Sequence, residues 1–388
     1  MLEEVFASIA HFAGAGACAK VIVADGVKMR EGEDATSKFR AGVVTREAEG
    51  KYRHYLRRVE RLTRTKTSVL YGARLLILHE RHGFAHALRR GICRAVSTPF
   101  VLVAQHDRSF VRAADLAAVV DAMAAANAKA PLSRAVGSEP SAAFRLNYVG
   151  FPTSTTVTHA RHVRSKYALE IAPFEAPRAA ADQDARAGAP ETTGRGAAER
   201  SSVALLPLLQ FYDSMHVAST RWYLSRVFGR ERYCTLPRGG FIEDTLGQLM
   251  LRAAREAARA AREAEADEGD GDAKERNARR VADAVREAHR PFGAYVRVAS
   301  VDPDAPGEPV CGHIDGRDSR LADGSNRKFW FEEKHTSEEA WGELEGKETD
   351  LHIAAGGEGD DDALLARDFV PGFFDPPDAV ALPGDVWI

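Results

Sequence analysis

A polar triplet, Gln105-His106-Asp107, directly follows the apolar run of residues 100–104. A carboxylate and an imidazole at the tip of a strand can hold a divalent cation, and a bound cation neutralises a diphosphate as it departs. We expect Asp107 to be a metal ligand, with His106 beside it in the same triplet. The alternative is that Asp107 only caps the turn at the end of the strand and that Arg108 lies on the surface. The triplet alone does not separate these two interpretations.

Two adjacent carboxylates, Glu243 and Asp244, follow a Gly239-Gly240 pair and precede apolar residues at helical spacing. At the first turn of a helix, the positive end of the helix dipole favours the ionised form of a carboxylate. An ionised carboxylate there can act as a general base at neutral pH. Acidic residues are also ordinary helix caps, and the pair taken alone favours this purely structural role.

The apolar pattern predicts the framework that would position these groups. Short apolar runs are typical of buried strands, and apolar residues every three or four positions are typical of helices that cover a sheet. The pattern predicts strands at 21–24, 75–78, 100–104 and 148–157, and helices at 2–12, within 31–66, at 84–96 and at 113–128. Strands that alternate with helices predict an α/β fold with a mostly parallel sheet flanked by helices. Polar residues at the C-terminal ends of its strands are in a typical site position.

Three segments depart from this alternation. Residues 177–200 contain almost no large apolar side chain, which predicts a flexible low-complexity loop. Residues 252–290 are rich in Ala, Arg and Glu and are broken by a turn of Gly and Asp, which predicts a charged insertion of two solvated helices. Residues 337–388 form an acidic C-terminal extension. We therefore expect one domain at 1–336 that carries both insertions.

The composition limits the class of protein. The chain has 388 residues, 45% hydrophobic and 28% charged, which is enough for one large domain or two smaller ones. A formal net charge of −3 argues against a general nucleic-acid binder, and four scattered cysteines argue against a disulfide framework. No run approaches the roughly 20 apolar residues of a membrane span, and no signal peptide is recognisable. We expect a soluble, cytoplasmic protein, or a protein of the Golgi or another secretory membrane if an N-terminal anchor has been lost.

The order of these features over residues 2–251 resembles the family 2 glycosyltransferases of the GT-A fold. In that family a strand ends in an Asp-Gly pair near the nucleotide, a helix opens on glycine, an Asp-x-Asp motif binds metal and sugar diphosphate, and an arginine precedes a Glu-Asp pair. The corresponding residues here are Asp25-Gly26, Gly83, the triplet 105–107, Arg221 and Glu243-Asp244. The resemblance implies a GT-A-like sheet flanked by helices.

The resemblance also implies roles for individual residues. It places Asp25 at the acid that contacts the nucleotide, and Asp107 at the metal-binding motif. It places Asp244 at the base, with Glu243 beside it in the catalytic pair. It makes Arg221 a substrate-binding residue.

A polar loop after the base holds two further candidates. Enzymes of this fold often take a metal or diphosphate contact from a histidine or arginine in this part of the chain. The resemblance therefore makes His313 a candidate metal ligand and Arg317 a candidate substrate-binding residue. The alternative is a turn-rich hairpin with ordinary surface charges.

The sequence departs from the family pattern at three places. Gln105 stands where the first Asp of the metal motif belongs, and Arg89 keeps a cation where the family has an Arg-Asn pair. We expect both Gln105 and Arg89 to contact substrate. Met1 falls inside the family's first helix, so the first strand of the family and its nucleotide-binding loop have no counterpart in the resemblance.

The resemblance implies a glycosyltransferase that moves a sugar from a nucleotide diphosphate donor to an acceptor hydroxyl, with inversion and with Mn²⁺ or Mg²⁺ as cofactor. The expected partners are the nucleotide sugar and an acceptor, with no nucleic acid. A non-catalytic module that binds a nucleotide sugar is the alternative, favoured by Gln105 and the missing strand. A nucleotidyltransferase shares the fold, but such enzymes normally begin with a glycine-rich loop.

Gln105 also affects which metal is expected. A glutamine offers only a neutral oxygen, so the triplet supplies one carboxylate and free metal should bind weakly. If His106 or His313 completes the shell, manganese is favoured over magnesium, because manganese accepts imidazole more readily. The oxygens of the nucleotide diphosphate would supply the missing charge.

Overall fold

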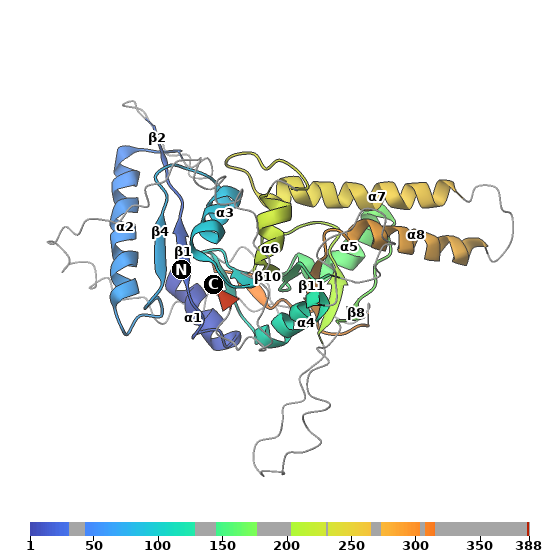
Figure 1. The fold of residues 1–388 in the computed structure, drawn as a ribbon, viewed down its shortest axis with the longest axis horizontal. Coiled ribbons are helices and arrows are strands. Elements are labelled where there is room, and N and C mark those ends of the chain that lie inside the picture. Colours follow the sequence, from blue (N-terminus) through green and yellow to red (C-terminus); the bar gives the residue numbers. More distant parts are fainter. Residues whose placement is uncertain are drawn as a thin grey trace, which may run out of the picture.

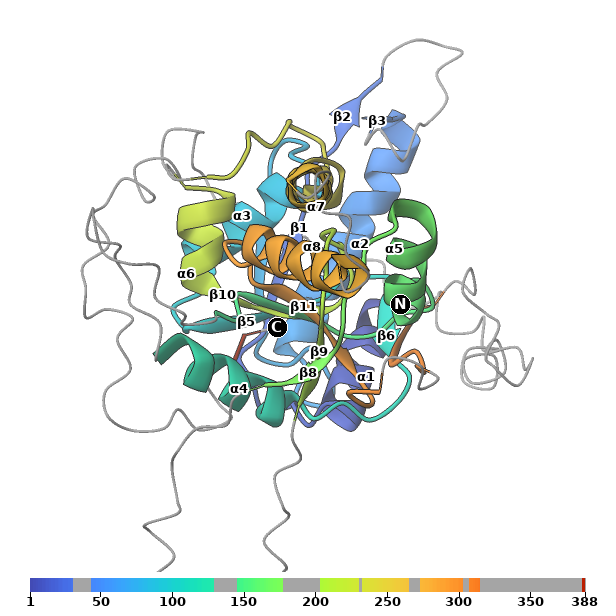
Figure 2. The same ribbon diagram turned by 90° about the vertical axis from the view of Figure 1, so that its right-hand side faces the viewer.

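The computed structural model describes residues 1–30, 43–128, 145–176, 203–229, 232–264, 273–302, 307–314 and the backbone of a two-residue strand, β13 (Val386–Trp387). A central sheet lies between two layers of helices (Figure 1). Seen from the side, α1 and α4 lie on one face of the sheet, whereas α3, α6, α7 and α8 lie on the other (Figure 2). The α/β class predicted from the apolar pattern is confirmed.

The first third of the chain follows the predicted alternation closely. The elements are α1 (Leu2–Phe12), β1 (Val21–Ala24), α2 (Arg46–Arg64), β4 (Arg74–Ile77), α3 (Phe84–Ala95), β5 (Phe100–Val103) and α4 (Leu116–Ala128). The strand β1 pairs in parallel with β4, and the two form a separate two-stranded sheet. A second short parallel pair joins β2 (Lys28–Met29) to β3 (Val43–Val44).

The main sheet corrects the prediction of a mostly parallel arrangement. Its order is β13-β5-β10-β7-β11-β9-β8, in which β10 is antiparallel to β5 and β7, and β9 is antiparallel to β11 and β8. Only the β13–β5 and β11–β7 pairs are parallel. The remaining strands are β7 (Tyr148–Gly150), β8 (Phe174–Glu175), β9 (Ala204–Pro207), β10 (His216–Ser219) and β11 (Ala294–Val298). The strands β5 and β7, with α4 between them in the chain, run in the same direction, as a helical crossover requires. They are not neighbours, because β10, from later in the chain, lies between them and runs against both.

Alternation of side chains along β5 builds a core on each face of the sheet. Phe100 and Leu102 join a cluster with α1 and α4, whereas Val101 and Val103 join a second cluster with α3 and the segment 222–250. Successive side chains of a strand point to opposite faces, so four apolar residues in a row predict a strand covered on both sides. This is the environment that β5 has.

The charged insertion forms two helices, α7 (Gln248–Glu263) and α8 (Ala273–His289), as the sequence predicts. The expectation that both are solvated is wrong for their facing sides. Ala254, Ala258 and Val285 are buried in a cluster that also contains residues of α5 (His159–Tyr167). Small and apolar residues at helical spacing let the two helices pack closely, while their charged residues remain outside.

A third small sheet lies beyond the tip of β5. It pairs β6 (Arg108–Phe110) with β12 (Cys311–His313) in antiparallel register, so that Arg108 lies opposite His313. The predicted strand at 148–157 is shorter than expected, because it ends at Gly150 and is followed by a turn and the 3₁₀ helix η2 (Thr156–Thr158). The segments 177–200 and 337–385 lie outside the described residues.

No helix in the described ranges is both long enough and apolar enough to cross a membrane. Cys18, Cys93, Cys234 and Cys311 are all free thiols, in agreement with their scattered positions in the sequence.

Candidate functional site

The candidate site lies at the edge of the sheet where β5 ends and β10 begins. His216 lies opposite Val103 in the antiparallel pair, so the residues before β10 meet the triplet that follows β5. The acids Glu243 and Asp244 open η4 (Glu243–Gly247), a π-helical turn that leads directly into α7. Single π-helical turns are rare and occur frequently at functional sites.

Asp107 and His313, which the resemblance made candidate metal ligands, lie close together. The ladder between β6 and β12 continues to a backbone bond from the Ile314 N–H to the Asp107 carbonyl, at 2.8 Å. This pairing places Nδ1 of His313 3.5 Å from Oδ2 of Asp107, and each side chain is 16% exposed. A carboxylate and an imidazole thus lie side by side at the tip of β5, where both are partly accessible to solvent.

Arg108 connects the triplet to the acid pair. Its Nε donates to Oε1 of Gln105 at 3.1 Å, which orients the Gln105 amide. Its charge also acts to lower the pKa of Glu243. Burial is the larger effect and raises the pKa of that carboxyl above its ordinary value. Arg108 is therefore part of the site, contrary to the interpretation of it as surface.

The acid pair is joined by a third carboxylate, Asp213, from the loop before β10. The Asp213 N–H donates to Oε2 of Glu243 at 3.3 Å, and the Glu243 N–H donates to Oδ2 of Asp213 at 3.2 Å. Asp213 is 6% exposed, Glu243 is half-buried and Asp244 is exposed. Burial raises the pKa of Asp213 to about 8, and the negative charges of Glu243 and Asp244 act in the same direction.

Asp25, at the end of β1, holds the turn that opens α3. Its Oδ1 accepts the N–H of His82 at 2.8 Å and that of Gly26 at 3.0 Å, while its Oδ2 accepts the N–H of Gly83 at 2.8 Å. The imidazole of His82 lies 3.6 Å from the same carboxylate. Most of the acceptor capacity of Asp25 is therefore used to fix this turn, and its partly exposed side chain lies beside the N-terminus of α3.

Close contact between two glycines joins the two halves of the site. The Gly239 N–H donates to the His82 carbonyl at 2.8 Å. A Cβ at Gly83 would lie 2.4 Å from Cα of Gly239, and both glycines have positive φ, at +80° and +81°. Phe241 then stacks on Phe84 at a centroid distance of 5.9 Å. The segment that leads to Glu243 thus lies directly on the turn that Asp25 holds.

The other predicted residues lie elsewhere or outside the described ranges. Arg89 is half-buried on α3, where its charge acts with burial to lower the pKa of His86. His106 is exposed. Arg221 follows β10 at the opposite end of the sheet, where the neighbouring Thr220 N–H donates to the Pro99 carbonyl at 3.0 Å. Arg317 lies in the segment that the structure does not describe.

Two residues of the site, Asp213 and Arg108, are not evident from the sequence pattern. Asp213 is a single acid in an irregular loop, and Arg108 follows the triplet without a motif of its own. The one signal that could have found Asp213 is its place just before a short apolar strand, because polar residues at strand ends gather at one edge of a sheet.

The donor set fits a cation only in part. Among the described residues, no group of three or more His, Cys, Asp or Glu side chains is arranged to hold a metal ion. Asp107 and His313 nevertheless form a pair of donors at 3.5 Å. Magnesium is commonly held by one or two carboxylates together with substrate phosphates, and manganese also accepts imidazole. The pair fits a cation that takes its remaining ligands from a bound diphosphate.

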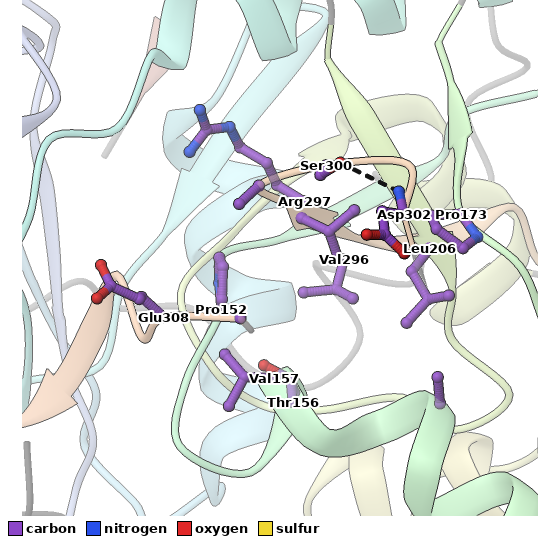
Figure 3. A pocket seen from close by; sticks show the side chains of 14 residues that line it. Pro152, Thr156, Val157, Pro173, Leu206, Val296, Arg297, Ser300, Asp302 and Glu308 are labelled. Carbon is purple, nitrogen blue, oxygen red and sulfur yellow. Dashed lines mark hydrogen bonds between the residues drawn. The ribbon is translucent and has the colours of Figure 1, made fainter. Parts of the chain in front are cut away.

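A small cavity of about 60 Å³ lies farther along the same edge of the sheet, at the ends of β7 and β11 (Figure 3). Val157, Leu206 and Val296 line it, and the Asp302 N–H donates to Oγ of Ser300 at its rim, at 3.1 Å. None of the carboxylates described above lines this cavity. It is separate from the candidate site.

No family model matches the sequence, and no curated protein or solved structure matches it.

Proposed function

We propose that the chain is a glycosyltransferase that moves a sugar from a nucleotide diphosphate donor to an acceptor hydroxyl, with inversion at the anomeric carbon. One observation carries the proposal: the Gly239 N–H bonds to the His82 carbonyl at 2.8 Å. This contact joins the turn held by Asp25 to the segment that carries Glu243 and Asp244. The proposal includes a GT-A-like arrangement in which β1, β4 and β5 form the nucleotide half.

The binding roles follow from position. Gln105 and Arg108 present a neutral and a cationic group at the tip of β5, where an anionic diphosphate would lie. Asp107 and His313 would hold a manganese or magnesium ion. Such an ion, when bound, would neutralise the charge that develops on the departing diphosphate. Asp25 and the N-terminus of α3 would contact the nucleotide.

The catalytic role is assigned to the acid pair. Asp244 is exposed and can be approached by an acceptor, whereas Glu243 is partly buried behind it. The carboxylate of Asp244 takes the proton of the acceptor hydroxyl. The oxygen of that hydroxyl forms a bond to the anomeric carbon, and the bond from that carbon to the diphosphate breaks with its electron pair leaving on the diphosphate.

A binding module without catalysis is the second candidate. It is favoured by the small donor set, because the described residues supply only Asp107 and His313 as a close pair of possible ligands at the tip of β5. It is also favoured by Asp25, whose carboxylate already accepts three backbone N–H groups. Such a module would bind a nucleotide sugar and release it unchanged.

Incubation of the full chain with labelled nucleotide sugars and manganese separates the two candidates. Slow hydrolysis or transfer of the donor that is lost in Asp244→Asn supports the enzyme. Binding of the donor without turnover supports the module. Absence of both binding and turnover over a panel of uridine and guanosine diphosphate sugars would contradict both.

A further inference from the structure

Asp213 and Glu243 hold each other through two backbone hydrogen bonds. Each backbone N–H donates to the carboxylate of the other residue, at 3.2 and 3.3 Å. The exchange resembles a capping box, in which two side chains satisfy each other's backbone donors. It fixes the loop before β10 to the first turn of η4, and it brings two carboxylates to one partly buried place.

The charges around Asp213 do not balance if Asp213 and Glu243 are both ionised. Glu243 and Asp244 add negative charge, and Arg108 is the cation whose attraction opposes them. From inside the protein, Asp213 faces Tyr148 and Tyr223, and burial raises the pKa of both phenols. These phenols are therefore neutral and supply no positive charge.

His216, a further titratable group beside these two phenols, is also neutral at pH 7. Its Nε2 lies 2.6 Å from the Tyr223 hydroxyl, and its Nδ1 lies 2.6 Å from the Ser214 carbonyl. Burial lowers the pKa of this imidazole to about 4. On the interior side of Asp213, the described residues therefore supply no cation to balance its charge.

The geometry indicates where a proton would be held. Oδ2 of Asp213 is occupied by the Glu243 N–H, whereas Oδ1 is buried and makes no hydrogen bond with the described residues. Two neighbouring carboxylates that share a site cannot both ionise easily, and they titrate as a coupled pair. A proton on Oδ1 leaves the pair with a single negative charge.

We propose that Asp213 is a positioning residue for the catalytic acids, which it anchors through the reciprocal backbone bonds while its Oδ1 carries a proton at neutral pH. The inference rests on the proposed function only for its effect on turnover. With the proton on Asp213, the two backbone bonds hold the first turn of η4, and Asp244 lies on the exposed side as the base. When the proton is lost, two adjacent carboxylates repel and the anchor opens.

The first test needs no substrate. In the full chain with ¹³C-labelled carboxyl groups, NMR should show an acid that titrates above neutral pH and disappears in Asp213→Asn. In Glu243→Gln, the midpoint of that acid should fall by about 1 pH unit or more, because the coupling is removed. An Asp213 that titrates in the ordinary acid range, or that does not respond to Glu243→Gln, would overturn the proposal.

The second test measures whether the two reciprocal backbone bonds hold the first turn of η4. Hydrogen exchange at the Glu243 amide should become at least about 10-fold faster in Asp213→Ala, but not in Asp213→Asn, because the asparagine oxygen still accepts this N–H. Asp283→Asn, an exposed carboxylate on α8 that pairs with Arg286, is the matched control. Equal exchange in Asp213→Ala and the wild type would show that the reciprocal bonds do not hold η4.

The third test uses turnover and therefore depends on the proposed function. Donor hydrolysis by the wild type should fall above about pH 8, whereas Asp213→Asn should keep its rate there. A purely structural Asp213 would leave the two pH profiles alike, which would contradict the proposal. If no variant hydrolyses any donor, the proposed function fails, and the NMR and exchange results still decide the role of Asp213.

Discussion

Nδ1 of His313 lies 3.5 Å from Oδ2 of Asp107, although the two residues are far apart in the sequence. The contact depends on the antiparallel pairing of β6 with β12, which places His313 opposite Arg108 and beside the tip of β5. Two protein donors leave most of a metal shell to other ligands. Under the proposed function, metal binding by this pair would therefore depend on the presence of a diphosphate.

We expect manganese to bind weakly to the chain alone and clearly when uridine or guanosine diphosphate is present, as measured by calorimetry. Asp107→Ala should weaken manganese-dependent binding of the diphosphate by at least about 10-fold, the loss typical even of groups that only support a ligand. Asp283→Ala should have no effect. Tight manganese binding without nucleotide, or binding that is unchanged in Asp107→Ala, would place the metal elsewhere.

We expect Asp244→Asn to reduce sugar transfer by about 10²–10⁴-fold, because the variant loses the group that takes the acceptor proton. Asp244 is exposed, so the variant should keep the unfolding midpoint of the wild type. Asp283→Asn, another exposed carboxylate, should keep full activity. Full transfer activity in Asp244→Asn would show that another group is the base.

We expect Asp25→Ala to lower the free energy of unfolding by about 2 kcal/mol, because three backbone N–H groups lose their acceptor. Asp25→Asn should cost less, since its oxygen still accepts from this turn. Urea unfolding of the two variants measures the difference. An unchanged midpoint in Asp25→Ala would mean that Asp25 does not hold the turn before α3.

A comparison of two glycines tests the contact between the halves of the site. Gly83→Ala should destabilise by about 1–3 kcal/mol, because it combines a φ of +80° with a contact of 2.4 Å to Gly239. Gly50→Ala should stabilise by about 0.5–1 kcal/mol, because Gly50 lies within α2 and its added Cβ meets nothing within 4 Å. Equal effects of the two substitutions on thermal unfolding would contradict the close approach.

Stability should fall as the pH decreases from about 6.5 towards 4. Burial lowers the pKa of His159 to about 3 and those of His216 and His289 to about 4, from an ordinary value of 6.5. In this window the unfolded chain binds more protons than the folded chain, so stability present above pH 6.5 is lost as the pH decreases. Each imidazole contributes a slope of up to about 1.4 kcal/mol per pH unit.

Urea unfolding at several pH values measures this slope. His159→Gln should reduce it, whereas substitution of the exposed His54 should leave it unchanged. Asp213 acts in the opposite sense: its pKa is raised from 3.8 to about 8, so its contribution is complete below 3.8 and is lost as the pH rises through 8. Stability that is constant from pH 7 to pH 4 would contradict the burial of the three imidazoles.

Local sequence patterns were enough to predict the elements of the first part of the chain. The predicted helices at 2–12 and 84–96 and the predicted strands at 21–24 and 100–104 agree with α1, α3, β1 and β5 within a residue. Each is a continuous apolar run or a helical stripe, so its pattern reports the environment of its own residues. The resemblance made Asp107 and His313 candidate ligands of one metal ion, and that role stays a prediction.

The tertiary structure alone decided strand direction and the remaining members of the site. The direction of β10 depends on pairing with β5 and β7, which are distant in the sequence, so a local pattern cannot specify it. That same direction carries Arg221 to the far end of the sheet and Asp213 to the near end. The acid that sequence analysis missed therefore meets Glu243, and the arginine that it singled out does not reach Asp107.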